Sequence, residues 1–471
     1  MPDADVGIVG GGLAGSMAAA MLGRAGISAV LTDVHRPYPP DFRCEKLDAS
    51  QVRLVFNTGL ASDILRLATP IDELWIARNG RLVEKRRNKQ FGIAYGDLVN
   101  AARDEIPQNI RFHRAKVSAI STSSTYQTIM LSGGERISVR LVVLATGLNN
   151  SMRQALRMFR EELSRCHSIS IGFDVIPNGR RSFDFPALTY FGESRTSRIG
   201  YITLFPIGST MRANLFVYCS MRDPWLSEFR DRPQETLFAC MPNLRKLLGD
   251  FALASDIKFR PVDLYVTHGH LQPGVVLLGD AFATSCPAAG TGVNKVLTDV
   301  ERLCNVHIPR WLATDGMGTE KIARFYGDYL KAACDAHSMS LAFYMRSLAI
   351  DGGLLWRARR WAWFCLQLAS DTLRQAREIR DRCNSAIRNR WSGWRILRER
   401  PQWLPGRRAG RRELRLGARW RSNLSFATRY PAAALARPSK IAAARFKPSA
   451  SRRNPKSEKP RPIPCDRARN A

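Results

Sequence analysis

Glycines near the N-terminus are the first residues whose spacing suggests a binding site. Gly10, Gly12 and Gly15 form the pattern G-x-G-x-x-G, with Leu13 and Ala14 inside it. Glycine at these positions permits a tight turn, a close approach of the backbone to a pyrophosphate, and close packing of a helix on a strand. The pattern therefore predicts that this turn binds a dinucleotide.

The elements expected around the glycines agree with that prediction. Residues 6–10 form a short apolar run typical of a buried parallel strand, and residues 16–24 are rich in helix-forming Ala, Met and Leu. A second apolar run, residues 27–32, ends at Asp33. The helix N-terminus would donate N–H groups to the phosphates, and Asp33 would accept hydrogen bonds from an adenosine ribose while disfavouring a 2′-phosphate.

A second glycine-rich segment lies at residues 274–294, after another apolar run. Its distinctive residues are Gly279, Asp280, Pro287, Gly290, Gly292, Val293 and Asn294. This order resembles the G-D…P-x-x-G-x-G-x-N segment of the FAD-dependent aromatic-ring monooxygenases, the p-hydroxybenzoate hydroxylase-like family. The resemblance implies FAD rather than NAD. A carboxylate after a buried strand can hold ribityl hydroxyls, and a helix that begins near Gly292 would direct its positive end at the flavin.

Residues 145–153 are a third match, similar to the A-D-G-x-x-S-x-x-R segment of the same family. Gly147 and Arg153 fit this pattern, whereas Thr146 replaces the aspartate and Asn150 the serine. In the family this segment contributes to FAD and NAD(P)H contacts. The resemblance therefore implies that Gly147 contacts the cofactor. Because of the two replacements, it gives weaker support to a contact between this segment and NAD(P)H.

Arg43 lies where the family places an arginine against the flavin, after the second strand. Two other positions depart from the pattern, because Ala283 replaces a usual histidine and Thr291 a usual glutamine. The resemblance extends over about residues 5–345 and identifies a divergent member.

In that family NADH or NADPH reduces the flavin, dioxygen adds to form a C4a-hydroperoxide, and one oxygen is transferred to an electron-rich small molecule. The resemblance implies the same reaction here, with FAD bound and NAD(P)H as a transient donor. The absence of a second G-x-G-x-x-G is consistent with transient donor binding. The sequence assigns no catalytic residue. His268 and His270 are more typical of a surface turn, and Cys286 of a small buried residue.

The expected fold class is α/β: a Rossmann-type FAD-binding domain, an inserted and mainly antiparallel substrate domain, and a C-terminal helical region. Strand-like runs at residues 168–175 and 212–218 predict the insertion, and spacings of three and four over residues 320–350 predict a helix. The expected boundaries are 1–165 with 265–345 for the FAD domain, 166–264 for the substrate domain, 346–383 for a helical segment and 384–471 for a basic, disordered tail.

The net charge of +31 is concentrated near the C-terminus. Residues 384–471 hold 24 basic residues against 4 acidic ones, which leaves +11 for the first 383 residues. A tether to nucleic acid or an anionic membrane is therefore an alternative of another class. Trp356 and Trp361 among arginines 357, 359 and 360 suit an interfacial helix, although packing on the body is favoured.

Two chemical alternatives stay within the flavoenzymes. Reduction of an isoprenoid or polyketide double bond is the main rival to hydroxylation, whereas halogenation is disfavoured because W-x-W-x-I-P is absent. Ten scattered cysteines without a C-x-x-C pair favour reduced thiols and a cytoplasmic location. The acidic start argues against a signal peptide, and no run of 18 uncharged apolar residues suggests a membrane span.

Overall fold

The computed structural model describes residues 2–43, 45–362, 365 and 369. The chain divides into two units, Met1–Trp391 and Ser392–Ala471, and every described residue lies in the first. The predicted basic tail, 384–471, and most of its preceding segment, 363–383, therefore lie outside the described residues. Among the residues that are described, no helix combines the length and apolar composition that a bilayer crossing requires.

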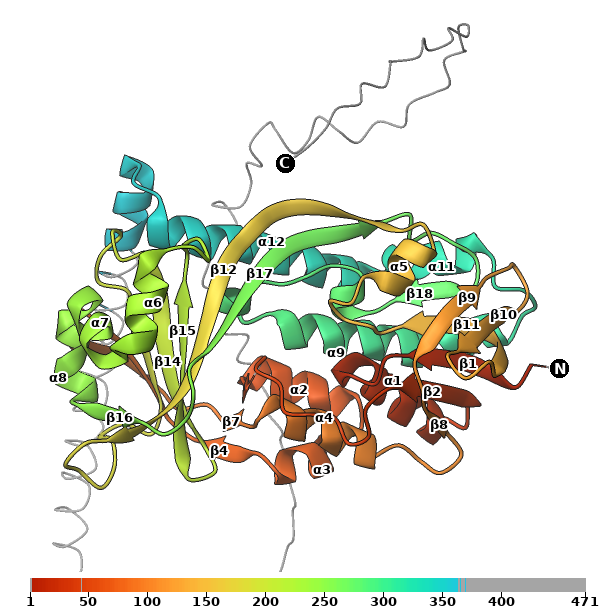
Figure 1. Cartoon of the computed structure of the whole chain (residues 1–471), viewed down its shortest axis with the longest axis horizontal. Helices are drawn as coiled ribbons and strands as arrows, with labels where there is room; N and C mark the ends of the chain where they lie inside the picture. The colour runs from red at the N-terminus through yellow and green to blue at the C-terminus, as the bar shows by residue number, and fades with distance from the viewer. Residues whose placement is uncertain (1, 44, 363–364, 366–368, 370–471) are drawn as a thin grey trace, which may run out of the picture. The chain divides into compact units, whose positions relative to one another are not determined.

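A seven-stranded sheet contains the N-terminal strand (Figure 1). Its strands are β8 (Arg111–Arg114), β2 (Ala29–Asp33), β1 (Ala4–Val9), β11 (Arg136–Leu144), β18 (Val275–Leu277), β10 (Gln127–Leu131) and β9 (Val117–Ser121). The first five are parallel, whereas β10 pairs antiparallel with β11 and β9. The central parallel strands β1, β2, β11 and β18 are largely apolar on both faces, because helices cover one face and the β9–β10 hairpin packs on the other.

Helices cover this sheet and carry the first hydrophobic core. They are α1 (Leu13–Arg24), α2 (Ala49–Asn57), α3 (Ala61–Arg66), α4 (Tyr95–Asp104), α9 (Gly292–Arg302), α10 (Ile308–Leu312) and α11 (Thr319–Tyr326), with the short α5 (Ser151–Ala155) elsewhere. Helix α1 is buried along nearly its whole length, since its alanines and glycines let it pack closely on the strands. The expected strand-turn-helix-strand unit at the N-terminus is therefore present.

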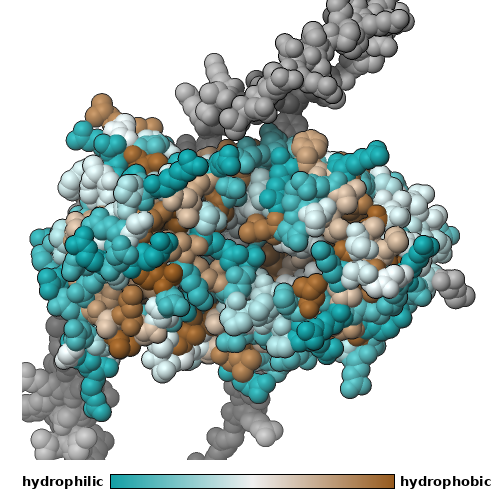
Figure 2. All heavy atoms as spheres, viewed as in Figure 1, coloured by the Kyte–Doolittle hydropathy of each residue, from teal (hydrophilic) through white to brown (hydrophobic). Residues whose placement is uncertain are grey.

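A second, eight-stranded sheet is mainly antiparallel. Its strands are β16 (Phe251–Leu253), β17 (Lys258–His268), β12 (Phe159–Pro177), β15 (Thr210–Val217), β14 (Ile199–Ile207), β13 (Leu188–Phe191), β5 (Leu74–Arg78) and β6 (Arg81–Arg86). One of its faces packs on α6 (Pro224–Asp231), α7 (Pro233–Cys240) and α8 (Arg245–Leu248). Figure 2 shows hydrophobic residues among hydrophilic ones on the viewed face of the molecule.

The α/β fold class with an inserted antiparallel sheet is confirmed. The sheet takes two more strands than the insertion itself supplies, because β13 pairs in parallel with β5, and β5 pairs with β6. Local sequence patterns do not reveal such pairing between segments that lie far apart in the chain. A small sheet of β3 (Lys46–Leu47), β7 (Gln90–Gly92) and β4 (Thr69–Ile71) lies against β14.

The helix predicted over residues 320–350 is wrong in two respects. It is interrupted at Gly327, so that α11 ends there and α12 (Tyr329–Ile350) begins after the cap Asp328. The predicted apolar stripe is not the buried face, since Leu330 is exposed whereas Lys331 and Ser338 are buried. The reason is tertiary, because the buried polar side chains find partners on α9 and in the loop before it.

Candidate functional site

Three of the segments singled out in the sequence meet at one edge of the seven-stranded sheet. Val9 lies beside both Thr32 and Leu144, and Leu144 lies beside Leu277. Because these strands are parallel, the loops that follow their ends leave from the same edge. The glycine turn, residues 145–150 and the Gly279–Asp280 turn are thereby brought together.

Two glycines of the turn, Gly10 and Gly15, are required by the protein's own backbone, whereas Gly12 faces open space. A Cβ atom on Gly15 would lie 1.9 Å from the carbonyl oxygen of Gly10, and Gly10 itself has a φ of +101°. By contrast, a Cβ on Gly12 would meet nothing within 4 Å. Gly12 caps the N-terminus of α1, where unpaired N–H groups attract phosphate. The space left beside Gly12 fits the pyrophosphate of a dinucleotide.

Asp33 is held at the end of β2 by the glycine turn. The N–H of Gly11 donates to Asp33 Oδ2 at 2.6 Å, and Arg103 Nη2 lies 3.4 Å from Asp33 Oδ1. Arg103 also donates from Nε to the carbonyl oxygen of Gly11 at 3.0 Å. The sequence analysis did not identify Arg103, because nothing in the local sequence of α4 distinguishes it from other helical arginines.

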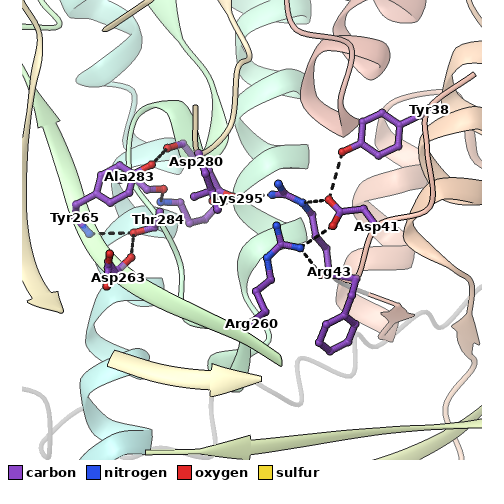
Figure 3. A network of polar contacts seen from close by, with 12 residues as sticks. Tyr38, Asp41, Arg43, Arg260, Asp263, Tyr265, Asp280, Ala283, Thr284 and Lys295 are labelled. Carbon is purple, nitrogen blue, oxygen red and sulfur yellow. Dashed lines mark hydrogen bonds and ion pairs between the residues drawn. The ribbon is translucent and has the colours of Figure 1, made fainter. Parts of the chain in front are cut away.

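Arg43 and Asp280, two of the residues singled out in the sequence, lie beside each other (Figure 3). Arg43 Nη1 lies 3.5 Å from Asp280 Oδ2, and Arg43 Nε donates to Asp41 Oδ2 at 2.6 Å. Arg260 of β17 donates to the other oxygen of Asp41 at 2.8 Å. Burial opposes the charge on Arg43, but Tyr95 and the two carboxylates outweigh burial and raise its pKa. The result is a fixed array of alternating charges beside the Asp280 turn.

Arg153 connects the loop of residues 145–150 to the Gly279–Asp280 turn. Its side chain is fully buried, and burial lowers its pKa. Nη1 donates to the carbonyl oxygen of Ala281 at 2.6 Å, and Nη2 donates to that of Asn149 at 2.9 Å. Arg153 therefore fixes the Gly147 loop against the Asp280 turn. The replacements at Thr146 and Asn150 leave this link intact.

The loop that follows Cys286 is positioned from both sides. Gly290 adopts a left-handed φ of +67°, and its carbonyl oxygen accepts a hydrogen bond from Gln51 Nε2 at 2.9 Å. From the second sheet, the hydroxyl of Tyr201 donates to the carbonyl oxygen of Ala288 at 2.9 Å. Helix α9 begins at Gly292 as expected, and Val293 is buried behind it.

Residues 3–306 match the family described as "FAD binding domain". The chain belongs to this family. The fold and the converging glycine and aspartate turns agree with that assignment. The protein is an FAD-dependent oxidoreductase. The space beside Gly12 and the Arg43–Asp280 pair are the features of this chain that fit the cofactor.

Curated relatives of this flavoprotein include monooxygenases. Kynurenine 3-monooxygenase of Dictyostelium discoideum is 24% identical over 336 residues, which are 63% of this chain and 68% of the relative. The 3-amino-4-hydroxybenzoate 2-monooxygenase PtnB3 of Streptomyces platensis is 22% identical over 335 residues, 67% of this chain and 80% of the relative.

Solved structures share the fold of the flavoprotein. The p-nitrophenol 4-monooxygenase PnpA of Pseudomonas putida has a TM-score of 0.63 at 17% identity, covering 80% of this chain and 96% of that one. A variant of the halogenase PltM in complex with FAD has a TM-score of 0.59 at 12% identity, covering 74% and 76% of the two chains.

One face of the second sheet is directed at the loop that follows Asp280. Alternation along a strand places every second residue on the same side, and the residues opposite this face pack on α6 to α8. Ser168 Oγ lies 3.3 Å from the Sγ of Cys286, in addition to the Tyr201 contact. The face carries Ser168, Ser170, Gly172 and Asp174 of β12, Arg212, Asn214 and Phe216 of β15, and Tyr201, Thr203 and Phe205 of β14.

A buried charge cluster occupies the polar part of this face. Arg212 Nη1 lies 2.6 Å from Glu45 Oε1, and Arg212 Nε lies 2.6 Å from Asp174 Oδ1. Burial raises the pKa of Glu45 to about 7 even though Arg212 opposes the shift, whereas the two carboxylates raise the pKa of Arg212 against its own burial. Burial dominates at Glu45, whose Oε2 is buried without a hydrogen-bond partner.

Two histidines and one cysteine were also considered in the sequence. His268 is half-exposed beside Glu161, and His270 packs against Phe282 and Tyr326. Cys286 is fully buried, and burial raises the pKa of its thiol. Within the described ranges, no group of three His, Cys, Asp or Glu side chains is arranged to hold a metal ion.

Proposed function

We propose that this flavoprotein is an NADH- or NADPH-consuming monooxygenase that hydroxylates a small aromatic ring with polar substituents. The observation that carries the proposal is the sheet face opposite the Pro287–Gly290 loop. There the ring centroids of Tyr201 and Phe216 lie 4.7 Å apart, on the same sheet face as the Glu45–Arg212 pair. Aromatic and charged groups together suit a ring that carries polar groups.

The names of the relatives support the substrate class. Both curated relatives are named as monooxygenases, and one of them acts on an aminated and hydroxylated benzoate. The structural neighbour from Pseudomonas putida is named for p-nitrophenol. We extend this class to the present chain as part of the proposal, with molecular oxygen as the second substrate.

The proposed FAD contacts follow the converging loops. They are Gly10, Gly12, Leu13, Ala14, Gly15, Asp33, Arg43, Gly147, Asp280, Pro287, Gly290, Gly292 and Val293. When bound, FAD would take electrons from the nicotinamide donor, react with dioxygen and supply one oxygen atom to the substrate. We propose the segments 1–165 and 265–345 as the FAD domain and 166–264, joined by β5 and β6, as the substrate domain.

The protein's part in this reaction is positioning and exclusion of water. The N-terminus of α1 would bind the pyrophosphate, and Asp33 would orient the ribose. Tyr201 and Ser168 join the sheet to the loop after Asp280, which would shield the reacting ring from water. Arg212 and Glu45 would orient polar substituents of the substrate.

The decisive experiment follows oxygen and product together. Purified holoenzyme is given NADH or NADPH with a panel of phenols, aminobenzoates and kynurenine, and dioxygen uptake is recorded while products are analysed by mass spectrometry with labelled dioxygen. We expect one labelled oxygen atom per product and faster NAD(P)H oxidation with substrate. Anaerobic reduction of a substrate double bond, with no label in any product, would instead establish the rival reductase activity.

A further inference from the structure

A cavity of about 190 Å³ lies beside the C-terminal end of α12. Its walls come from β5, from the turn between β13 and β14, from the last residues of α12 and from the helical residues 354–362. It borders the sheet face of the proposed substrate site, because the ring of Phe191 in its wall lies 5.9 Å from that of Tyr201. The residues that line the cavity include none of the proposed FAD contacts, so the cavity is separate from those contacts.

Three arginines line the cavity: Arg78, Arg195 and Arg360. Burial and the charge of Arg360 lower the pKa of Arg78, and burial and the charge of Arg195 lower the pKa of Arg360. The cations are thus close enough to repel one another. Bringing like charges together is unfavourable, and a bound anion would relieve the repulsion.

Glu193, the acidic side chain in the cavity wall, accepts hydrogen bonds from Tyr190 and Asn243. Glu193 Oε1 accepts hydrogen bonds from the Tyr190 hydroxyl at 2.6 Å and from the Asn243 N–H at 2.9 Å, and Oε2 accepts from Asn243 Nδ2 at 2.8 Å. Those contacts tie Glu193 to the wall rather than to the arginines. The three arginines outnumber it, so the lining has a net positive charge.

Arg360 is held in place before any ligand binds. Its Nη1 donates to the carbonyl oxygens of Leu348 at 3.0 Å and Asp351 at 2.9 Å, at the C-terminal end of α12. A guanidinium that is already fixed loses little side-chain freedom when it binds an anion. The planar arrangement of its donors also matches the two oxygens of a carboxylate.

The rest of the wall is apolar. Phe191, Ile199, Met345, Leu348 and Ala349 contribute hydrocarbon surface, and Trp361 lies at the rim. An apolar cavity of about 150 Å³ is large enough to hold benzene, so this one has room for a single ring. A bare phosphate would pair with the arginines and leave these apolar side chains without contact.

We propose that this cavity is a binding site for a small aromatic carboxylate, distinct from the site where the flavin and its substrate meet. The arginines would bind the carboxylate, and the ring would lie against Phe191 and Met345. The assignment is independent of the reaction proposed above, because it requires neither turnover nor a particular substrate at the flavin.

The test uses FAD-loaded protein and isothermal titration with benzoate, benzyl alcohol and inorganic phosphate. Arg195→Gln removes one exposed cation, Ala349→Phe fills the apolar wall, and Arg222→Gln is the matched control, an exposed arginine outside the cavity. Flavin absorbance is recorded in the same samples, because benzoate at the flavin site would change the flavin spectrum.

We expect benzoate to bind without a change in the flavin spectrum, about tenfold more weakly in Arg195→Gln, and undetectably in Ala349→Phe. The control should bind like the native protein, and benzyl alcohol should not bind. Equal benzoate affinity in native protein and Arg195→Gln would overturn the proposal, as would binding of phosphate but not benzoate. Thermal unfolding verifies that each variant is folded, and Arg195→Gln decides the matter if Ala349→Phe is not.

Discussion

The ammonium group of Lys331 lies 3.0 Å from Asp299 Oδ1, and the two side chains are only 1% and 2% exposed. The second oxygen of Asp299 accepts the N–H of Gly279 at 2.9 Å, in the turn that carries Asp280. Asp335 and Lys295 complete the network, with Lys295 3.0 Å from Asp335 Oδ1. Helix α12 thus holds the Gly279–Asp280 turn through buried charges.

Replacing Lys331 by methionine should be strongly destabilising. Burial acts to lower the pKa of Lys331, but Asp299 and Asp335 outweigh burial and raise it, so the side chain is charged. Without it the buried Asp299 loses its ion-pair partner, which costs about 3–5 kcal/mol. Urea unfolding of Lys331→Met measures the loss, with the exposed Lys258→Met as control. The double variant Lys331→Met/Asp299→Asn should recover much of it; no recovery would contradict the charge argument.

Two glycines of the N-terminal turn should separate cofactor binding from folding. Ala at position 12 meets no protein atom, so Gly12→Ala should leave the thermal unfolding of the apoprotein unchanged while weakening FAD binding by about tenfold or more. Ala at position 15 would clash with the Gly10 carbonyl, so Gly15→Ala should lower both the unfolding temperature of the apoprotein and its affinity for FAD. Flavin fluorescence gives the FAD dissociation constant, and Gly133→Ala, in an open turn, is the control. Native FAD affinity in Gly12→Ala would remove the case for a pyrophosphate at this position.

The stability of the apoprotein should fall between about pH 4.5 and pH 7 because of Glu45. Burial raises the pKa of Glu45 from 4.5 to about 7, so the unfolded chain ionises first as the pH rises. The contribution of Glu45 is complete below pH 4.5 and lost above about pH 7, a change of about 3 kcal/mol. The Glu45→Gln variant has no ionisable group at this position. The change in its unfolding free energy over the same pH range should therefore be smaller than that of the native protein by the contribution of Glu45. The exposed Glu162→Gln should keep the native pH dependence, and a native profile in Glu45→Gln would contradict the assignment.

Asp280 should contribute to FAD affinity through its charge and position beside Arg43. We expect Asp280→Asn to weaken FAD binding by about tenfold, the usual effect of losing a hydrogen bond to a charged group. Equilibrium dialysis of FAD against each protein provides the measurement. The exposed Asp256→Asn serves as control, since it removes the same charge away from the site. An unchanged affinity in Asp280→Asn would exclude the carboxylate from the cofactor site.

The sequence by itself determined the local features of this protein. The glycine turn, the helix after it and Asp33 were all predictable, because φ angles, apolar periodicity and strand ends depend on residues close together in the chain. The same holds for the Gly279–Asp280 turn and the start of α9 at Gly292. These segments sufficed to imply FAD and the α/β class.

Only the tertiary structure decided which distant residues share an environment. Arg103 beside Asp33, Arg153 between two loops, and the strands β5 and β6 in the second sheet could not be read from local patterns, since strand pairing and buried ion pairs join residues that lie far apart in the chain. The buried face of α12 was mispredicted for the same reason. From the sequence alone, Lys331 would be expected on the surface. It is stable inside the protein because the fold places Asp299 and Asp335 within 3.0 Å of its ammonium group.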